Sequence, residues 1–176
     1  MDSSGIGNII FTQEQIQKRI AEVGSEITRD YRDKDLVVVS VLKGSLYFVA
    51  DLTRCIDLPL EVDFLSIGLS SDPPSKKPER FTSPKTWISI IKGRDVLLAE
   101  DVIGTGLTLG YICQHLEAYE PASLKICTLL DNPAERLLTI KIDYRCFEMP
   151  DTFLIGYGLD YREKYRNLPY IAEFKK

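Results

Sequence analysis

Two adjacent carboxylates, Glu100 and Asp101, stand directly before a glycine-rich turn in the segment VLLAEDVIGTGLTL, residues 96–109. Glycines permit a tight turn and a close approach of the backbone to a ligand. The amides of a following helix start, with the hydroxyls of Thr105 and Thr108, can bind a phosphate. Because like charges repel, the carboxylates are predicted to bind sugar hydroxyls or a magnesium ion instead. A phosphate beside a diol indicates a ribose 5-phosphate.

The strands that must position this segment are predicted from runs of apolar and β-branched residues. These runs lie at 36–42, 61–67, 95–99 and 124–130, with two shorter apolar pieces at 144–147 and 153–157. Continuous apolar runs of this length are typical of parallel strands that are covered on both faces. In such sheets, ligands bind at the carboxyl ends of the strands.

The helices are predicted from apolar residues at helical spacing. A capping-box pattern, Thr12 with Gln15, precedes a helix that continues to Tyr31. Ser45 is expected to cap a second helix that ends at Cys55, and a third helix is predicted over 107–119. Strands that alternate with helices of this length predict an α/β fold with a mostly parallel sheet.

Composition limits the classes of function. The chain has 176 residues, 44% of them hydrophobic, and a net charge of −4, which predicts one domain over 1–176 with a substantial core. The mixed charges argue against nucleic acid or a membrane as a partner. The start of the chain, MDSSGIGN, has no signal-peptide pattern. Four widely spaced cysteines and a single histidine disfavour a zinc site and favour reduced thiols in a cytoplasmic protein.

The segment 70–86, SSDPPSKKPERFTSPKT, interrupts the alternation of strands and helices. It contains four prolines, several basic residues and almost no apolar side chains. A loop of this length inside a compact domain is typically either functional or disordered. We predict a lid over the ligand site, and a solvated insertion is the alternative.

The segment 96–109 resembles the phosphoribosyl-pyrophosphate (PRPP) motif of type I phosphoribosyltransferases. Other motifs are similar to those of the hypoxanthine-guanine branch: LKGS (42–45) before ADL (50–52), EVDF (61–64), TLLD (128–131), PDTFLIGYGLDY (150–161) and YRNLPYI (165–171). The resemblance covers roughly residues 10–173. It implies the type I phosphoribosyltransferase fold: a mostly parallel sheet flanked by helices, a flexible lid loop at about 69–88, and a small base-binding hood from the carboxyl-terminal region at about 144–176.

The resemblance also implies an activity: Mg²⁺-dependent transfer of a purine base to the anomeric carbon of PRPP, or of a related sugar pyrophosphate, with release of pyrophosphate and a nucleotide. A homodimer or homotetramer is expected. The expected catalytic residues are Glu100, Asp101, Lys43 and Arg166.

Each part of the substrate is assigned to residues that match the motifs. The ribose hydroxyls are assigned to the acid pair, the 5-phosphate to Thr105, Gly106, Leu107 and Thr108, and the pyrophosphate to Lys43, Gly44 and Arg166. Phe153 is expected to stack on the base, while Leu154 offers backbone groups to its edge. Asp160 is expected near a magnesium-bound water and the base edge, so the expected metal-site residues are Glu100, Asp101 and Asp160.

The sequence departs from the family pattern at three places: two single residues and one pair. Gly104 stands where the family has a second aspartate, the proposed proton acceptor at the purine, and Asn132 stands where a lysine donates to a 6-oxo group. Leu69 and Ser70 replace a Ser-Tyr pair of the lid. Asparagine can donate or accept, so a 6-amino purine such as adenine is a candidate beside hypoxanthine and guanine.

The departures leave several hypotheses open. Gly104 indicates a lost general base, extra room for a larger sugar or base, or neutral drift in a slow enzyme. An enzyme of purine salvage is the leading hypothesis, and a specialised-pathway transferase with an unusual sugar or base is a variant of it. The alternatives are a regulator that binds PRPP or nucleotide without turnover, and an oligomeric scaffold with a vestigial site.

Overall fold

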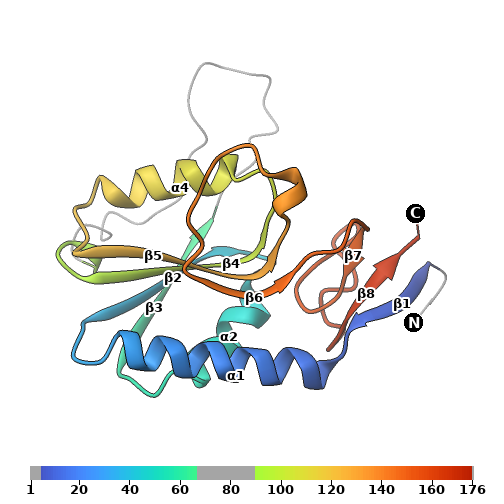
Figure 1. Ribbon diagram of the computed structural model, residues 1–176, viewed down its shortest axis with the longest axis horizontal. Helices are drawn as coiled ribbons and strands as arrows, with labels where there is room; N and C mark the ends of the chain where they lie inside the picture. Colours follow the sequence, from blue (N-terminus) through green and yellow to red (C-terminus); the bar gives the residue numbers. More distant parts are fainter. Residues whose placement is uncertain (1–4, 67–89, 176) are drawn as a thin grey trace.

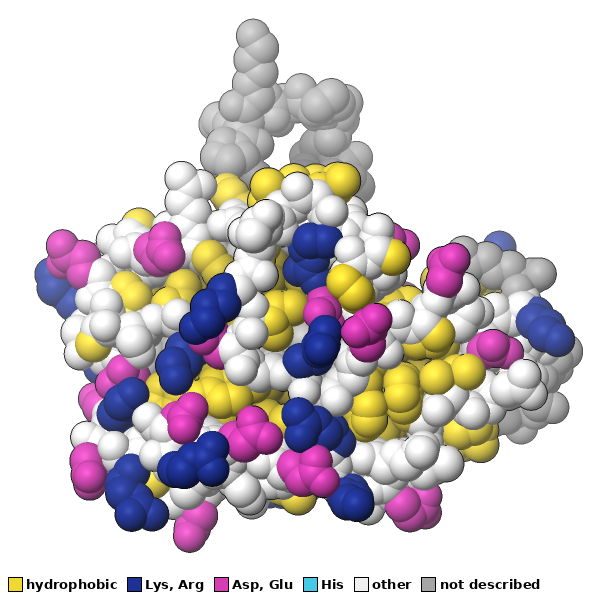
Figure 2. Space-filling view, in the orientation of Figure 1, with side chains coloured by type: hydrophobic (Ala, Val, Ile, Leu, Met, Phe, Trp, Pro, Cys, Tyr) yellow, Lys and Arg dark blue, Asp and Glu magenta, His cyan; other side chains and the backbone are white. Residues whose placement is uncertain are grey.

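The computed structural model describes residues 5–66 and 90–175. The predicted lid, with Leu69 and Ser70, lies outside the described residues. Within those ranges no helix combines the length and the apolar character needed to cross a membrane. On the face that Figure 2 presents, basic and acidic side chains are interspersed, in keeping with the mixed charge of the sequence.

A five-stranded parallel sheet forms the centre of the molecule, in the strand order β3-β2-β4-β5-β6 (Figure 1). The strands are β2 (Leu36–Leu42), β3 (Leu60–Ser66), β4 (Asp95–Ile103), β5 (Ser123–Asp131) and β6 (Tyr144–Glu148). Every neighbouring pair is parallel. The first five residues of β2 are buried, which is why its sequence is a continuous apolar run rather than an alternating one.

Helices cover both faces of this sheet, with α1 (Gln13–Asp30) and α2 (Leu46–Arg54) on one face and α4 (Leu107–Glu117) on the other (Figure 1). The predicted capping box is confirmed, since Gln15 N donates to Thr12 Oγ1 at 3.3 Å and Thr12 N donates to Gln15 Oε1 at 2.8 Å. The apolar stripe of α1 is buried against the sheet at the predicted spacing: Ile16, Ile20, Val23 and Ile27.

Several predicted boundaries are corrected. Ser45 is the N-cap residue of α2 and Cys55 its C-cap residue, as predicted, but the Ser45 side chain does not cap the helix, because its hydroxyl accepts from Ser40 Oγ at 2.6 Å and donates to Val41 O at 2.5 Å. Strand β4 continues past Ala99 to Ile103, so the acid pair lies inside a strand instead of after one. Charged residues are typical of loops, so the sequence pattern predicted that the strand ends before the carboxylates. In the structure, the parallel pairing of β4 with β5 continues through them.

A second sheet, antiparallel and in the order β1-β8-β7, forms the hood. Its strands are β1 (Ile6–Phe11), β7 (Leu154–Ile155) and β8 (Ile171–Phe174). The predicted hood is therefore wrong at two places: β6 belongs to the main sheet, and β1 comes from the amino-terminal end of the chain. The ends of the described chain consequently lie side by side (Figure 1).

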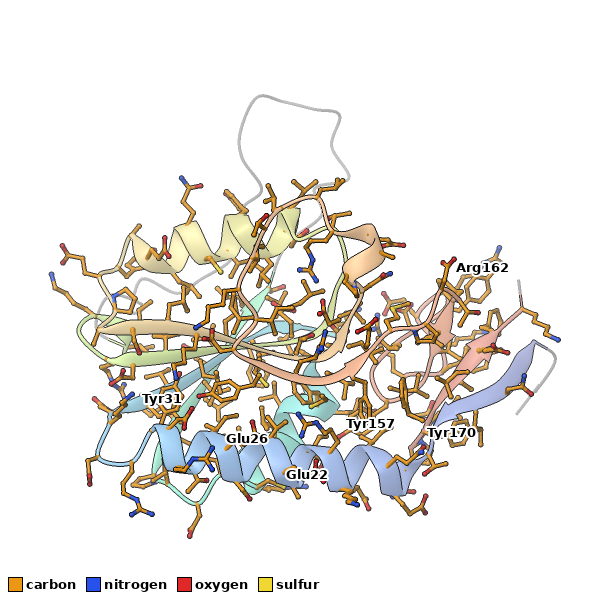
Figure 3. All side chains as sticks on the ribbon, in the orientation of Figure 1. Glu22, Glu26, Tyr31, Tyr157, Arg162 and Tyr170 are labelled. Carbon is orange, nitrogen blue, oxygen red and sulfur yellow. The ribbon has the colours of Figure 1, made fainter. Side chains whose placement is uncertain are left out.

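The hood is fixed to the main sheet through residues 156–158. Tyr157 Oη donates to Asp51 Oδ2 of α2 at 2.5 Å, and its ring centre lies 6.4 Å from that of Tyr47. Figure 3 shows Tyr157 where the hood meets the helices below the sheet. Gly158 lies so close to the loop after β2 that a Cβ atom on it would overlap the carbonyl oxygen of Gly44. The hood thus borders the carboxyl end of the main sheet.

Candidate active site

The carboxyl ends of β2, β4 and β5 bring most of the predicted site residues to one edge of the sheet. Lys43 and Gly44 follow β2, Gly104 follows β4, and Asn132 follows β5. The peptide bond between Leu42 and Lys43 is cis. Loops from the hood, residues 156–166, pack against the first of these ends.

Glu100 and Asp101 are consecutive residues of β4, so their side chains leave the strand toward opposite faces of the sheet. Asp101 lies against the loop after β2, where a Cβ atom on Gly44 would overlap its Oδ2. Glu100 lies on the face covered by α4, where the pKa of Cys113 is raised mainly by burial and further by the charges of Glu117 and Glu100. The two carboxylates therefore approach the strand end from two sides.

Glu100 is buried, and its Oε1 has no hydrogen-bond partner among the residues that the structure describes. Burial raises the pKa of Glu100 well above its usual value, and the charge of Asp101 raises it further. Burial also raises the pKa of Asp101, although a 3.0 Å hydrogen bond from Val102 N and the nearby charge of Arg166 oppose the shift. Buried polar groups are nearly always partnered, so Glu100 is a candidate for a ligand contact.

The predicted phosphate cradle is a pocket of about 100 Å³ at the amino-terminal end of α4. Gly106, the N-cap residue, has a φ of 83°, a left-handed conformation that favours glycine. Thr105 Oγ1 accepts from Leu107 N at 3.3 Å, which leaves the hydroxyl proton available as a donor. The first turn contains no acidic side chain that would compete for the helix amides. The pocket is lined by Val102, Ile103, Gly104, Thr105, Gly106, Thr108 and Leu109.

The two predicted pyrophosphate cations are joined by an acid that the sequence reasoning missed. Glu163 Oε2 lies 3.1 Å from Lys43 Nζ and 3.5 Å from Arg166 Nη2. Arg166 also pairs with Asp160 Oδ1 at 2.8 Å and donates to Gly158 O at 2.7 Å. Nothing in the sequence distinguishes Glu163 from the other charged residues of its loop.

The base end of the predicted site contains residues from β5 and the hood. Asn132 is 7% exposed, and its backbone N donates to Ile103 O at 2.9 Å. Phe153 is 38% exposed, with its ring edge-on to Tyr161 at 6.1 Å between ring centres. The Leu154 side chain is buried, and its backbone pairs with Glu173 in the hood sheet. A ring face with this exposure can stack on a planar ligand.

Carboxylates at this edge of the sheet suit magnesium, but residues 5–66 and 90–175 contain no group of three or more side chains that would hold a metal alone. Magnesium is usually bound by one or two carboxylates together with substrate phosphates. The unpartnered oxygen of Glu100 and the neighbouring Asp101 fit such a shared site. Both oxygens of Asp160 are engaged, one by Arg166 and the other by Glu163 N at 2.8 Å.

Comparisons with known proteins identify the family of this chain. A family model for the phosphoribosyl transferase domain matches residues 8–162, and the chain therefore belongs to that family. Within it, the chain falls in the hypoxanthine-guanine branch. It is 42% identical over 170 residues to the hypoxanthine-guanine phosphoribosyltransferase of Bacillus subtilis, a match that covers 97% of this chain and 94% of that protein. It is 41% identical to the hypoxanthine phosphoribosyltransferase of Haemophilus influenzae, with 94% of each chain covered.

Solved structures give the same result. The hypoxanthine-guanine phosphoribosyltransferase of Bacillus anthracis matches with a TM-score of 0.87 and 36% identity, over 98% of this chain and 99% of that one. The hypoxanthine phosphoribosyltransferase of Trypanosoma cruzi matches with a TM-score of 0.88 and 34% identity, over 99% and 94%. The predicted family, branch and fold class are thus confirmed, while the roles of the individual site residues stay predictions.

Proposed function

We propose that this chain transfers a purine-type base to the anomeric carbon of PRPP and releases pyrophosphate and a nucleotide. The observation that carries the proposal is the unpartnered, buried carboxyl of Glu100 beside a phosphate-sized pocket at the start of α4. A diol-binding acid beside a phosphate cradle suits a phosphorylated ribose. The names of the relatives, hypoxanthine-guanine and hypoxanthine phosphoribosyltransferase, support the same reaction.

The proposed roles follow the geometry of the site. Glu100 and Asp101 accept hydrogen bonds from the ribose hydroxyls, while Thr105, Thr108 and the amides at the start of α4 donate to the 5-phosphate. Lys43 and Arg166 hold the pyrophosphate and stabilise the charge that develops on it as it leaves. Magnesium, held by Glu100 and Asp101 together with the ligand, would add positive charge at the leaving group.

The direct test mixes the full chain with Mg²⁺, PRPP and a panel of purine bases, and measures pyrophosphate release. Turnover with at least one base is expected. PRPP binding without turnover would favour the second candidate, a regulator, which the missing aspartate at Gly104 supports. The absence of both binding and turnover would favour a scaffold. A homodimer or homotetramer stays a prediction, as does a cytoplasmic location. The four cysteines, predicted to be reduced thiols, are all free.

Thr108→Ala tests the phosphate cradle. Binding of PRPP and of a nucleoside 5-monophosphate should weaken at least about tenfold, because a hydrogen bond to a charged group contributes roughly 1.5–3 kcal/mol. Isothermal titration calorimetry measures both affinities. Thr53→Ala is the matched control, since that hydroxyl donates to backbone carbonyls within α2, to Val49 O at 2.8 Å and to Ala50 O at 3.4 Å. Unchanged affinity for both ligands in the Thr108 variant would show that the phosphate binds elsewhere.

The base is proposed to include 6-amino purines because of Asn132. Asn132→Lys should shift the ratio of kcat/KM values toward hypoxanthine and guanine by roughly tenfold or more, since an ammonium group facing an amino group stays unpaired. Steady-state kinetics with adenine, hypoxanthine and guanine measure the shift. Asn8→Lys, at an exposed position of β1, is the control. A wild-type enzyme that already uses hypoxanthine as well as adenine would contradict the argument.

A further inference from the structure

Gly104 stands where the family pattern has a carboxylate, but its surroundings are not those of a glycine that the fold requires. It is not among the glycines with positive φ, so the backbone would accept an ordinary L residue. Among the residues that the structure describes, a Cβ atom built on Gly104 would meet a single neighbour within 4 Å, the Oε2 atom of Glu135 at 3.1 Å. A carboxylate thus lies within reach of the space that an aspartate side chain at this position would occupy, and it comes from a different loop.

The loop that carries Glu135 is tied to the loop that carries Gly104. Glu135 ends η1 (Pro133–Glu135), a short 3₁₀ helix that begins directly after Asn132. Asn132 N donates to Ile103 O at 2.9 Å. Beyond η1, Leu137 N donates to Thr105 O at 2.9 Å. The backbone on both sides of Glu135 is therefore held against the residues on both sides of Gly104.

Neighbouring charges hold the same loop but leave Glu135 itself unpaired. Arg136 Nη2 donates to Ile103 O at 3.2 Å and pairs with Asp131, whose second oxygen lies 3.1 Å from Arg145 Nη1. Both oxygens of Asp131 are thus engaged by arginines. Glu135 is exposed and, within residues 5–66 and 90–175, forms no hydrogen bond or ion pair. Its carboxylate is available to a ligand.

We propose that Glu135 is the proton acceptor at the purine, and that it replaces from a neighbouring loop the carboxylate that position 104 lacks. The inference rests on the proposed function. As a ring nitrogen of the base gives its lone pair to the anomeric carbon, the bond from that carbon to the pyrophosphate oxygen breaks, and its electrons leave with pyrophosphate. The proton of the imidazole-ring N–H passes to the Glu135 carboxylate, so the nucleotide is released with a neutral base.

Two of the three hypotheses for Gly104, the missing general base and the extra room, then become one. Removing the aspartate side chain opens room beside the base, and the longer side chain of Glu135 uses that room to bring in a carboxylate from the side of Asn132. The proton acceptor, Glu135, and the base-recognition residue, Asn132, consequently belong to one segment, residues 132–135. In the family pattern they lie at the ends of two different strands, after β4 and after β5.

Glu135→Gln tests the proposal in the full chain, with kcat and the KM for PRPP as separate readouts. A general base contributes roughly 10²–10⁴ in rate, so kcat should fall at least about a hundredfold while the KM for PRPP changes little. Glu117→Gln, an exposed acid of α4, is the matched control and should keep wild-type kinetics. A Glu135→Gln variant with near wild-type kcat would overturn the proposal.

A carboxylate swap separates proton acceptance from a structural role. In the Glu135→Gln background, Gly104→Asp should raise kcat at least about tenfold. This gain is part of the roughly 10²–10⁴ that a general base contributes to the rate. In the wild type, Gly104→Asp should give no gain, because two carboxylates this close cannot both stay ionised. Failure of the swap to restore turnover, or a loss matched by weaker PRPP binding, would overturn the inference. If the wild type turned over none of the bases, both the proposed function and this inference would be refuted.

Discussion

Gly44→Ala will lower kcat for pyrophosphate release at least about a hundredfold, because a misplacement of about 1 Å in a catalytic group costs that much. The added methyl group would overlap Asp101 Oδ2, and the loop cannot retreat on its other side, where Gly158 packs against the Gly44 carbonyl. The carboxylate of Asp101 must therefore move away from the ribose hydroxyls that it is proposed to bind.

Gly110→Ala is the matched control for Gly44→Ala. Gly110 lies inside α4, and within the described part of the chain an added Cβ would meet one atom from outside the helix within 4 Å, the Cδ1 methyl of Leu138 at 3.0 Å. Leu138 is 40% exposed, so its side chain can shift. This variant should keep its activity and gain about 0.5–1 kcal/mol in unfolding free energy, since alanine is favoured over glycine in a helix. A Gly44→Ala enzyme with near wild-type kcat would show that the position of Asp101 is not critical.

Glu100→Gln should lower kcat/KM for PRPP roughly 10- to 100-fold while it makes the ligand-free protein more stable. The loss of activity follows from the removal of a charged acceptor for the ribose hydroxyls, worth roughly 1.5–3 kcal/mol. The gain in stability follows from burial, which raises the pKa of Glu100 in the folded state above the usual 4.5. A lower kcat/KM together with a higher stability of the ligand-free variant would identify Glu100 as a ligand-binding group rather than a structural one.

The pH dependence of this gain has a definite sign. A raised carboxyl pKa means that the folded state binds the proton more tightly than the unfolded state, so wild-type stability is lost as the pH rises from about 4.5 through the folded pKa. Each pKa unit corresponds to about 1.4 kcal/mol. Melting temperatures of Glu100→Gln and wild type should therefore differ most at neutral pH and converge toward pH 4.5. A constant difference across that range would contradict the role of burial.

Much of the fold could be predicted because its signals are local. The capping box of Thr12 and Gln15 and the continuous apolar run of β2 each depend on neighbours within one element. The acid pair and the glycine turn likewise lie within one segment, and the residues of the turn line a pocket of about 100 Å³.

The features that sequence reasoning missed depend on residues far apart in the chain. Strands β1 and β8 pair across almost the whole sequence, β8 has only four residues, and the pairing contains irregular register shifts. Glu135 and Glu163 are ordinary loop acids without periodicity, and their neighbours become apparent only when Gly104 and Lys43 are placed in space. The backbone angle of Gly104, which decides what a substitution there costs, also depends on the folded structure.

The bridge that Glu163 forms between Lys43 and Arg166 bears on how the leaving group departs. Lys43 and Arg166, the two cations proposed to hold the pyrophosphate, carry like charges, and Glu163 together with Asp160 offsets these charges in the ligand-free site. The Lys43–Glu163 pair is exposed and therefore weak, so an incoming ligand with several charges displaces it readily. After the reaction, the tethered carboxylate is still at high local concentration. On the proposed roles of Lys43 and Arg166, pyrophosphate would leave in exchange with an anion that cannot diffuse away.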